Sequence, residues 1–276
     1  MTSNRSTEAA WPLRGGPLPA ELADAVSSVV ARLAPLGRRF EFFPTVGSTN
    51  DVAAQHAAAG DHEGAVFVAD AQTAGRGRRG RTWFSPPGAG LYVSTILRPA
   101  GSAERERATL LTTIAAGVAL AEGVARSTGL TPSLKWPNDL YVATRKLGGI
   151  LAEGIGESVV LGYGINVSTA SFPRELGDRA TSLETELGRG VDRARVFAET
   201  LAALAGRYDD LLAGRFDAIL DAWRALAPGA HGARVSWTTT AGERSGTTAG
   251  IDERGALLVR TTSGVERIVA GELVWR

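Results

Sequence analysis

The sequence predicts an α+β fold: a mixed sheet with flanking helices, followed by a small C-terminal β-barrel. Runs with strand character follow one another around a few helical patterns, which is typical of α+β proteins. After Pro228 the chain changes to short strand-like runs separated by glycine turns, which favours a small barrel. With 44% hydrophobic and 21% charged residues, the chain also has enough apolar material for a packed core.

The first half of the chain contains three helical and three strand patterns. Apolar residues recur at helical spacing from Leu22 to Leu33, and the stretch around 108–126 is apolar nearly all round, as in a buried core helix. The expected helices are 19–34, 50–59 and 108–126, the expected strands are 40–46, 65–69 and 91–97, and residues 1–19 form a mobile tail.

The second half begins with strands and continues with two helices. Strands are expected at 134–142, 148–153 and 159–167, with a turn at 143–146, and two helices within 192–227, with Gly214 near their junction. The C-terminal strands are expected at 234–240, 246–251, 256–262 and 265–270. These patterns divide the chain into a tail with one helix (1–39), a central domain (40–228) and a C-terminal domain (229–276).

The composition excludes several classes of function. Lys and Arg number 30 against 29 Asp and Glu, so a globally basic coat for nucleic acid is excluded. The chain has no cysteine, which excludes disulfides, thiolate metal sites and cysteine nucleophiles. The three histidines, His56, His62 and His231, lack a metal-ligand spacing. Without a signal peptide or an uninterrupted apolar span, we expect a cytoplasmic protein with no membrane association.

Lysine is rare in this chain. Only two of the 30 basic residues are lysine, Lys135 and Lys146. An arginine-rich genome explains the bias, and chance alone can place two lysines close together. The retention of two compact ammonium groups in one short stretch nevertheless suggests a tight site that arginine does not fit.

The strongest chemical signal is a glycine–arginine loop at residues 72–84. Its glycines fit the dinucleotide-binding pattern G-x-G-x-x-G, and the segment also nearly matches the P-loop pattern. Both motifs require a helix to begin directly after the loop, and the prolines that follow prevent one. Like charges about 6 Å apart repel by about 0.7 kcal/mol in water, so the arginine cluster predicts an anionic ligand. A solvated basic loop or an RNA-binding tract is the competing interpretation, and the adjoining Trp83 and Phe84 favour a structured site. The arginines are Arg76, Arg78, Arg79 and Arg81.

Four shorter motifs place polar groups or glycines beside predicted elements. In Lys135-Trp-Pro-Asn-Asp139 the carboxylate of Asp139 suits Mg²⁺ with support from Asn138, while an ordinary turn explains the motif equally well. Segments 146–151 and 162–167 put glycines in strands, where a ligand can approach the backbone. Gly47-Ser-Thr-Asn50 offers hydroxyl and amide groups before a helix, although a helix N-cap would use the same residues.

This inventory suggests a nucleotide-using enzyme without a catalytic histidine or cysteine. Chemistry at a phosphoryl centre suits it, because such reactions need positioning and cations more than a protein nucleophile.

The motifs together resemble those of the biotin protein ligase family. The match covers about residues 40–168. The resemblance implies a class II synthetase-like catalytic domain and an SH3-like C-terminal domain. The matching segments are, in order, Gly47–Asn50, Gly75–Ser85, Lys135–Asp139, Lys146–Leu151 and Gly162–Val167.

The resemblance implies a two-step reaction that uses biotin, ATP and Mg²⁺. The biotin carboxylate attacks the α-phosphorus to give biotinyl-5′-AMP, and a carrier-protein lysine then attacks the acyl carbon. The acceptor would be the biotin carboxyl carrier protein domain of acetyl-CoA carboxylase or another biotin-dependent carboxylase. Trp83 would cover the adenylate as the loop becomes ordered.

The resemblance also implies the site residues. Catalytic roles would fall to Arg78, Lys146 and Asp139, with Asp139 also facing the metal. Biotin would contact Ser48, Thr49, Asn50, Gln72, Gly75, Arg76, Gly77, Arg78 and Lys146. ATP or the adenylate would contact Arg78, Arg81, Trp83, Asn138, Asp139, Lys146 and Asn166.

Bifunctional members of the family carry an N-terminal winged helix, which needs three helices of about eleven residues each. The segment before residue 40 supplies one predicted helix. We therefore expect no DNA binding and no repressor activity, in a monomer or a weak homodimer.

Two other functions compete with this one. A lipoate protein ligase would share the fold but is expected to lack the arginine–tryptophan string. A nonenzymatic nucleic-acid-binding protein would use the arginine loop, but the six tryptophans are scattered rather than interleaved with a basic stripe.

Overall fold

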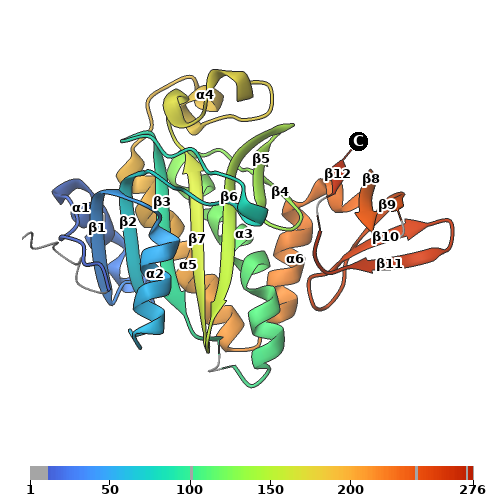
Figure 1. Ribbon diagram of the computed structural model, residues 1–276, viewed down its shortest axis with the longest axis horizontal. Coiled ribbons are helices and arrows are strands. Elements are labelled where there is room, and N and C mark those ends of the chain that lie inside the picture. The colour runs from blue at the N-terminus through green and yellow to red at the C-terminus, as the bar shows by residue number, and fades with distance from the viewer. Residues whose placement is uncertain (1–11, 100–101, 240–241, 272, 276) are drawn as a thin grey trace, which may run out of the picture.

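The computed structural model describes residues 12–99, 102–239, 242–271 and 273–275. Within these residues, seven strands form a mixed sheet in the order β1-β2-β3-β7-β6-β5-β4 (Figure 1). A second, antiparallel sheet has five strands in the order β11-β10-β9-β8-β12. The predicted α+β class with a separate C-terminal β-structure is therefore confirmed.

The large sheet contains β1 (Arg39–Val46), β2 (Ala65–Gln72), β3 (Gly90–Leu97), β4 (Ser133–Lys135), β5 (Asp139–Val142), β6 (Arg145–Ile155) and β7 (Ser158–Asn166). The helices are α1 (Ala20–Val29), α2 (Thr49–Ala58), α3 (Arg105–Thr128), α4 (Leu183–Leu187), α5 (Arg193–Leu212) and α6 (Phe216–Leu226). The second sheet contains β8 (His231–Thr239), β9 (Gly242–Ile251), β10 (Leu257–Thr261), β11 (Gly264–Ile268) and β12 (Val274–Trp275).

Helices cover the two faces of the large sheet unequally. A large apolar cluster joins α1, α3 and α5 to one face and continues into the C-terminal sheet through Val235, Leu257 and Val259. A smaller cluster lies between α2 and the opposite face of β1, β2 and β3. The loop between β2 and β3 crosses that second face in front of β6 (Figure 1). This asymmetry leaves the face of β6 and β7 available for a site beneath the loop.

The helix α3 is the centre of the helical layer. A Cβ at Gly123 would lie 2.4 Å from Thr200 Cα, so α3 and α5 cross in a backbone contact that glycine permits. The helix ends at Gly129, which has a left-handed conformation with φ 84°. By length and hydropathy α3 could cross a membrane, but 72% of its most apolar window is buried, as in the core helix of a soluble protein.

Residues 12–19, predicted as part of a mobile tail, pack against the edge of the large sheet. Gly16 and Phe42 of β1 exchange two backbone hydrogen bonds of 2.9 Å. The Gly15 N–H donates to Oε2 of the buried Glu41 over 2.8 Å. The tail prediction is therefore wrong for residues 12–19, because a strand edge and a buried carboxylate hold this backbone. Residues 1–11 lie outside the described part of the chain.

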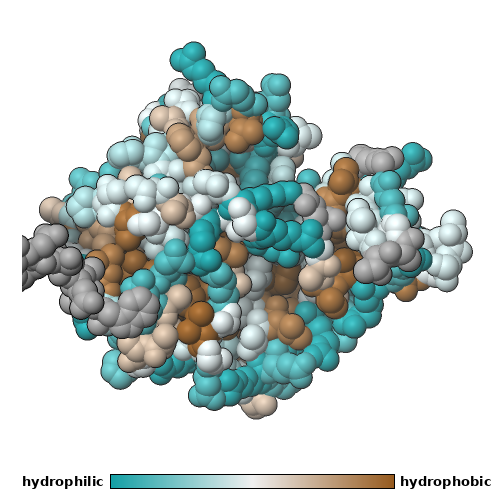
Figure 2. Space-filling view, viewed as in Figure 1, coloured by the Kyte–Doolittle hydropathy of each residue, from teal (hydrophilic) through white to brown (hydrophobic). Residues whose placement is uncertain are grey.

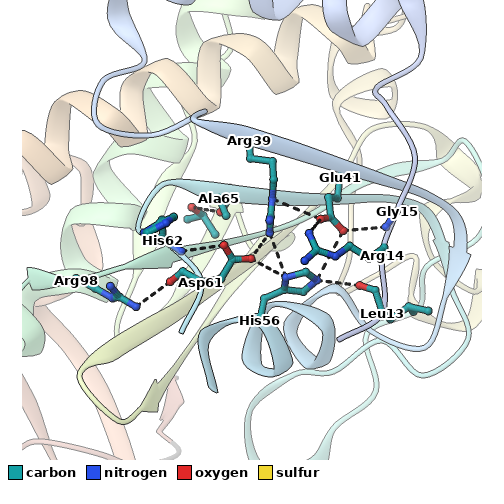
Figure 3. A network of polar contacts seen from close by, with 11 residues as sticks. Leu13, Arg14, Gly15, Arg39, Glu41, His56, Asp61, His62, Ala65 and Arg98 are labelled. Carbon is teal, nitrogen blue, oxygen red and sulfur yellow. Dashed lines mark hydrogen bonds and ion pairs between the residues drawn. The ribbon is translucent and has the colours of Figure 1, made fainter. Parts of the chain in front are cut away.

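A network of charged side chains joins the N-terminal segment to β1 and α2 (Figure 3). His56 is fully buried, with Nδ1 2.7 Å from Asp61 Oδ2 and Nε2 2.8 Å from the Leu13 carbonyl oxygen. Arg39 forms ion pairs with Asp61 and with Glu41. Burial acts to raise the pKa of Asp61, but hydrogen bonds, first from His56, outweigh it and hold that pKa below its ordinary value. Each carboxylate of the network lies beside Arg39, and this pairing offsets the free-energy cost of removing the charges from water.

The single strand predicted at 134–142 is wrong. The segment is an antiparallel hairpin in which Lys135 pairs with Asp139 across a turn. The turn looks strand-like in sequence because Trp136 is buried, with Nε1 donating to the Gly255 carbonyl over 2.9 Å. The short elements α4 and β12 were not predicted, whereas the two helices expected within 192–227 are confirmed as α5 and α6.

Replacing Asp61 by Asn should lower the free energy of unfolding by about 1–2 kcal/mol at pH 7, because His56 and Arg39 lose an ionised partner. The folded-state pKa of Asp61 lies below its unfolded value. The contribution is therefore complete above about pH 4 and is lost as the pH falls through the folded-state pKa. Urea unfolding should show the penalty shrinking between pH 7 and pH 3.

The matched control is Asp221→Asn, since Asp221 is exposed and pairs only locally with Arg224 among the contacts of the described chain. It should change stability by less than about 0.5 kcal/mol. A penalty for Asp61→Asn that stays constant down to pH 3 would contradict this account of the network.

Candidate active site

A cavity of about 720 Å³ opens between the large sheet and the C-terminal sheet. Its walls come from the N-terminus of α2, the loop between β2 and β3, the β4–β5 hairpin, and strands β6 and β7. Figure 2 shows a hydrophilic band in the middle of this face, where Figure 1 shows the loop crossing in front of β6. Segments that are far apart in the sequence therefore meet at this cavity.

Glycines in β7 let side chains from other elements pack directly on the strand backbone at the floor of the cavity. A Cβ at Gly162 of β7 would fall 1.8 Å from Asn50 Oδ1, and a Cβ at Gly164 would fall 2.4 Å from Trp83 Nε1. Tyr163, between them, points to the opposite face, where it meets α5. Because side chains alternate along a strand, α2 and the loop lie directly on the bare backbone of one face.

The N-terminus of α2 presents a polar cluster at one end of the cavity. Gln72 Oε1 accepts hydrogen bonds from Thr49 N–H over 2.9 Å and from Thr49 Oγ1 over 3.2 Å. Gln72 Nε2 in turn donates to Ser85 Oγ over 2.9 Å. Ser48 occupies the N-cap position, but its side chain makes no capping hydrogen bond and lines the cavity. The helix-cap interpretation therefore does not account for this hydroxyl.

The glycine–arginine loop is a tight hairpin. Gly77 N–H donates to the Arg81 carbonyl over 2.7 Å, and Trp83 N–H donates to the Gly75 carbonyl over 2.8 Å. Arg79, in the turn, has a left-handed backbone with φ 58°. A Cβ at Gly75 would lie 2.4 Å from the Trp83 carbonyl oxygen, so the base of the hairpin requires glycine. This backbone presents arginine side chains and Trp83 on the cavity wall.

Lys146 and Asp139 form an ion pair in the cavity wall. Lys146 Nζ lies 2.6 Å from Asp139 Oδ1 and 5.6 Å from the centre of the Trp83 ring. The two side chains remain 32% and 22% exposed, respectively, so an anion in the cavity can reach the ammonium group. The carboxylate fixes the position of that ammonium group.

The turn of the β4–β5 hairpin holds one of the loop arginines. Asn138 Nδ2 donates to the Ile150 carbonyl over 2.7 Å, and Asn138 Oδ1 accepts from Arg78 Nη1 over 3.1 Å. The segment is thus an ordinary turn and also part of the cavity wall. The side-chain amide of Asn138 connects β6 to the loop between β2 and β3.

The second lysine of the chain lines the same cavity. Lys135 Nζ lies 4.8 Å from the ring centre of Tyr141 and 5.4 Å from that of Trp275. Burial lowers the pKa of Lys135, and the neighbouring positive charge of Lys146 lowers it further. The negative charge of Asp139 acts in the opposite direction but does not cancel these effects. Burial, with a contribution from Asp139, raises the pKa of Tyr141 to about 12, so this phenol is protonated at neutral pH. Both lysines therefore interact electrostatically with Asp139 in the wall of the same cavity.

Nearly all residues predicted for the site line this one cavity. They are Ser48, Thr49, Asn50, Gln72, Arg76, Gly77, Arg78, Arg81, Trp83, Asn138, Asp139, Lys146 and Asn166. Gly75 does not line it and instead closes the base of the hairpin behind the wall. The contacts predicted for each residue with a particular ligand stay predictions.

Sequence reasoning missed two parts of the cavity wall. Phe172 and Leu176 belong to a segment of short 3₁₀ turns, and Leu273 and Trp275 belong to the C-terminal end of the chain. The first segment is tied to Lys146, whose N–H donates to the Arg179 carbonyl over 2.8 Å. Neither part has a hydrophobic period that marks it in sequence.

The residues present do not suit a metal ion held by the protein alone. Within the described ranges, no group of three or more His, Cys, Asp or Glu side chains could hold a metal ion. The Asp139 carboxylate is engaged by Lys146. A single carboxylate suits a Mg²⁺ ion whose other ligands are the phosphate oxygens of a bound nucleotide. The predicted contact of Asp139 with a metal ion therefore stays a prediction, and it applies to a magnesium–nucleotide complex.

Two family models match the chain. Residues 42–169 match the biotin/lipoate A/B protein ligase family. Residues 231–274 match the biotin protein ligase C-terminal domain. The first match spans nearly all of the large sheet, and the second spans nearly all of the C-terminal sheet.

Individual proteins agree with these matches. The chain is 35% identical over 262 residues to the bifunctional ligase/repressor BirA of Bacillus spizizenii, covering 92% of this chain and 79% of the relative. It is 35% identical over 221 residues to the biotin–[acetyl-CoA-carboxylase] ligase of Paracoccus denitrificans, covering 76% of this chain and 89% of that one. The biotin protein ligase of Aquifex aeolicus in complex with biotin and ATP has a TM-score of 0.75 at 30% identity, covering 87% and 99%, respectively.

Replacing Gly162 by Ala should destabilise the protein by about 1–3 kcal/mol, because the new methyl group would overlap the side chain of Asn50. Thermal unfolding measures this effect. The matched control is Gly154→Ala on β6, where a Cβ would have no heavy atom within 4 Å, and it should cost less than about 1 kcal/mol. Equal melting temperatures for the two variants would mean that the floor tolerates a side chain.

Proposed function

Because this chain belongs to the biotin/lipoate A/B protein ligase family, we propose that its cavity joins biotin to ATP and passes the biotin to a lysine of a carrier protein. The observation that carries this proposal is the convergence of five separate motifs on one cavity around the Lys146–Asp139 pair. The match of residues 231–274 to a biotin protein ligase C-terminal domain favours biotin over lipoate. The nucleic-acid-binding alternative has no comparable support.

The first step must bring two anions together. At about 4 Å, the biotin carboxylate and the ATP α-phosphate repel by about 4 kcal/mol in a protein-like dielectric. Lys146, fixed by Asp139, and Arg78, held by Asn138, supply preorganised positive charge against this repulsion. Mg²⁺ bound to the nucleotide neutralises further phosphate charge.

The bond changes in this step need no protein nucleophile. A carboxylate oxygen of biotin forms a bond to the α-phosphorus while the bond from that phosphorus to the bridging oxygen of pyrophosphate breaks. The products are biotinyl-5′-AMP and pyrophosphate. The contribution of the protein is to align the reactants over the glycine floor.

The second step transfers biotin to an amine. The acceptor nitrogen forms an amide bond with the acyl carbon, the bond from that carbon to AMP breaks, and the amine loses a proton. A lysine with a pKa of about 10.4 is mostly protonated at pH 7, so a nearby carboxylate assists. In this proposal Asp139, which lines the cavity, takes that role. Trp83 covers the anhydride and limits its hydrolysis.

The acceptor in this proposal is the biotin carrier domain of acetyl-CoA carboxylase or another biotin-dependent carboxylase. Three further expectations stay predictions: that the chain binds no DNA, that it is a monomer or weak homodimer, and that it is cytoplasmic. The soluble enzyme fold with its buried apolar helix agrees with the last of these.

The purified protein should biotinylate a carrier domain when supplied with biotin, ATP and Mg²⁺, as seen by mass measurement of the acceptor. Lys146→Ala should slow this reaction by at least about a hundredfold, because preorganised charge at the reacting centre is lost. Circular dichroism should show that the fold of the variant persists.

Two controls make this experiment decisive. Arg145→Ala removes a neighbouring cation that pairs with Glu186 outside the cavity, and should leave the rate within a fewfold of wild type. Replacing biotin with lipoate should leave the acceptor unmodified. Attachment of lipoate alone, or a near-normal rate for Lys146→Ala, would contradict the proposal.

A further inference from the structure

Glu153 of β6 contacts two parts of the site that are distant in sequence. Its Oε2 accepts a hydrogen bond from Asn50 Nδ2 over 2.9 Å and another from Arg76 Nη2 over 2.6 Å. Asn50 lies in the first turn of α2, and Arg76 lies in the glycine–arginine loop. Glu153 therefore joins α2, the loop and β6 through one oxygen atom.

These contacts fix the orientation of the Asn50 amide. Ser94 Oγ donates to Asn50 Oδ1 over 2.6 Å, so the amide oxygen faces β3. The amide nitrogen then faces β6, where Glu153 accepts from it and the Leu151 carbonyl lies 3.4 Å away. A carboxylate, which accepts only, allows no alternative orientation.

The same oxygen helps to hold the loop in place. Arg76 Nη2 lies between Glu153 Oε2 and Asp51 Oδ1, the latter 2.9 Å away. Asp51 is 49% exposed and Glu153 is 30% exposed, so the Glu153 contact is the less screened of the two. At the other end of the loop, Ser85 is bonded to Gln72, which bonds to Thr49 beside Asn50. Both ends of the loop are thus tied to the start of α2.

Glu153 does not line the cavity, whereas Asn50 and Arg76 do. We infer that Glu153 is a positioning residue that couples the biotin-contacting start of α2 to the arginine loop. This inference rests on the proposed function. The carboxylate presents the Asn50 amide to the ligand and holds the loop above it as one hydrogen-bonded unit.

The test compares Glu153 with the other carboxylate that holds Arg76. Glu153→Ala should raise the KM for biotin about tenfold, while kcat changes less than about threefold, because binding geometry is lost and the reacting cations are kept. Glu153→Gln keeps an acceptor oxygen but loses the charge, and should raise the same KM about threefold. Asp51→Asn weakens the more exposed contact to Arg76 and leaves the hydrogen bonds of Asn50 to Glu153 and Ser94 in place, so it should leave the KM within about twofold.

A merely structural role would give a different pattern. It would lower the melting temperature and the fraction of active protein in Glu153→Ala while the biotin KM stayed at its wild-type value, and that result would overturn the inference. An equal rise in KM for Asp51→Asn would also overturn it. If Glu153→Ala fails to fold, Glu153→Gln decides by the same KM criterion. Wild-type protein that fails to label the acceptor would refute the proposed function instead, so the two failures are distinguishable.

Discussion

The cavity depends on the close approach of side chains to a bare strand backbone. Asn50 and Trp83 occupy the space that side chains at Gly162 and Gly164 would fill. Because alternate residues of β7 face the helical layer, Tyr163 packs on that side while Gly162 and Gly164 present only backbone to the other. With larger residues at these two positions, neither the start of α2 nor the arginine loop could reach its position.

The charges around this floor are arranged so that cations are held in place by neighbours. Asp139 holds Lys146, Asn138 holds Arg78, and Glu153 holds Arg76. A preorganised cation needs little rearrangement when an anion binds, which is how charge contributes most to a reaction at phosphorus. In a chain so rich in arginine, the placement of both lysines on the wall of one cavity fits a need for compact cations there.

Much of this organisation was predictable from sequence because it rests on local signals. Alternating or continuous apolar runs predicted most strands, and the resemblance of the local motifs to the biotin protein ligase family implied the residues that line the cavity. The β4–β5 hairpin was missed because Trp136 makes its turn as apolar as its strands. Residues 12–19 were misjudged because their hydrogen bonds go to distant residues such as Glu41. Glu153 was missed for the same reason, since its role comes from contacts with Asn50 and Arg76 rather than from its own segment.

A crystal structure of the protein with biotin and a non-hydrolysable ATP analogue tests the central claim most directly. The account predicts that biotin lies in the cavity against Asn50 and Trp83, the side chains that pack on Gly162 and Gly164, with the carboxylate and α-phosphate both facing Lys146. Electron density for biotin elsewhere on the protein, with this cavity vacant and Lys146 facing neither group, would contradict it.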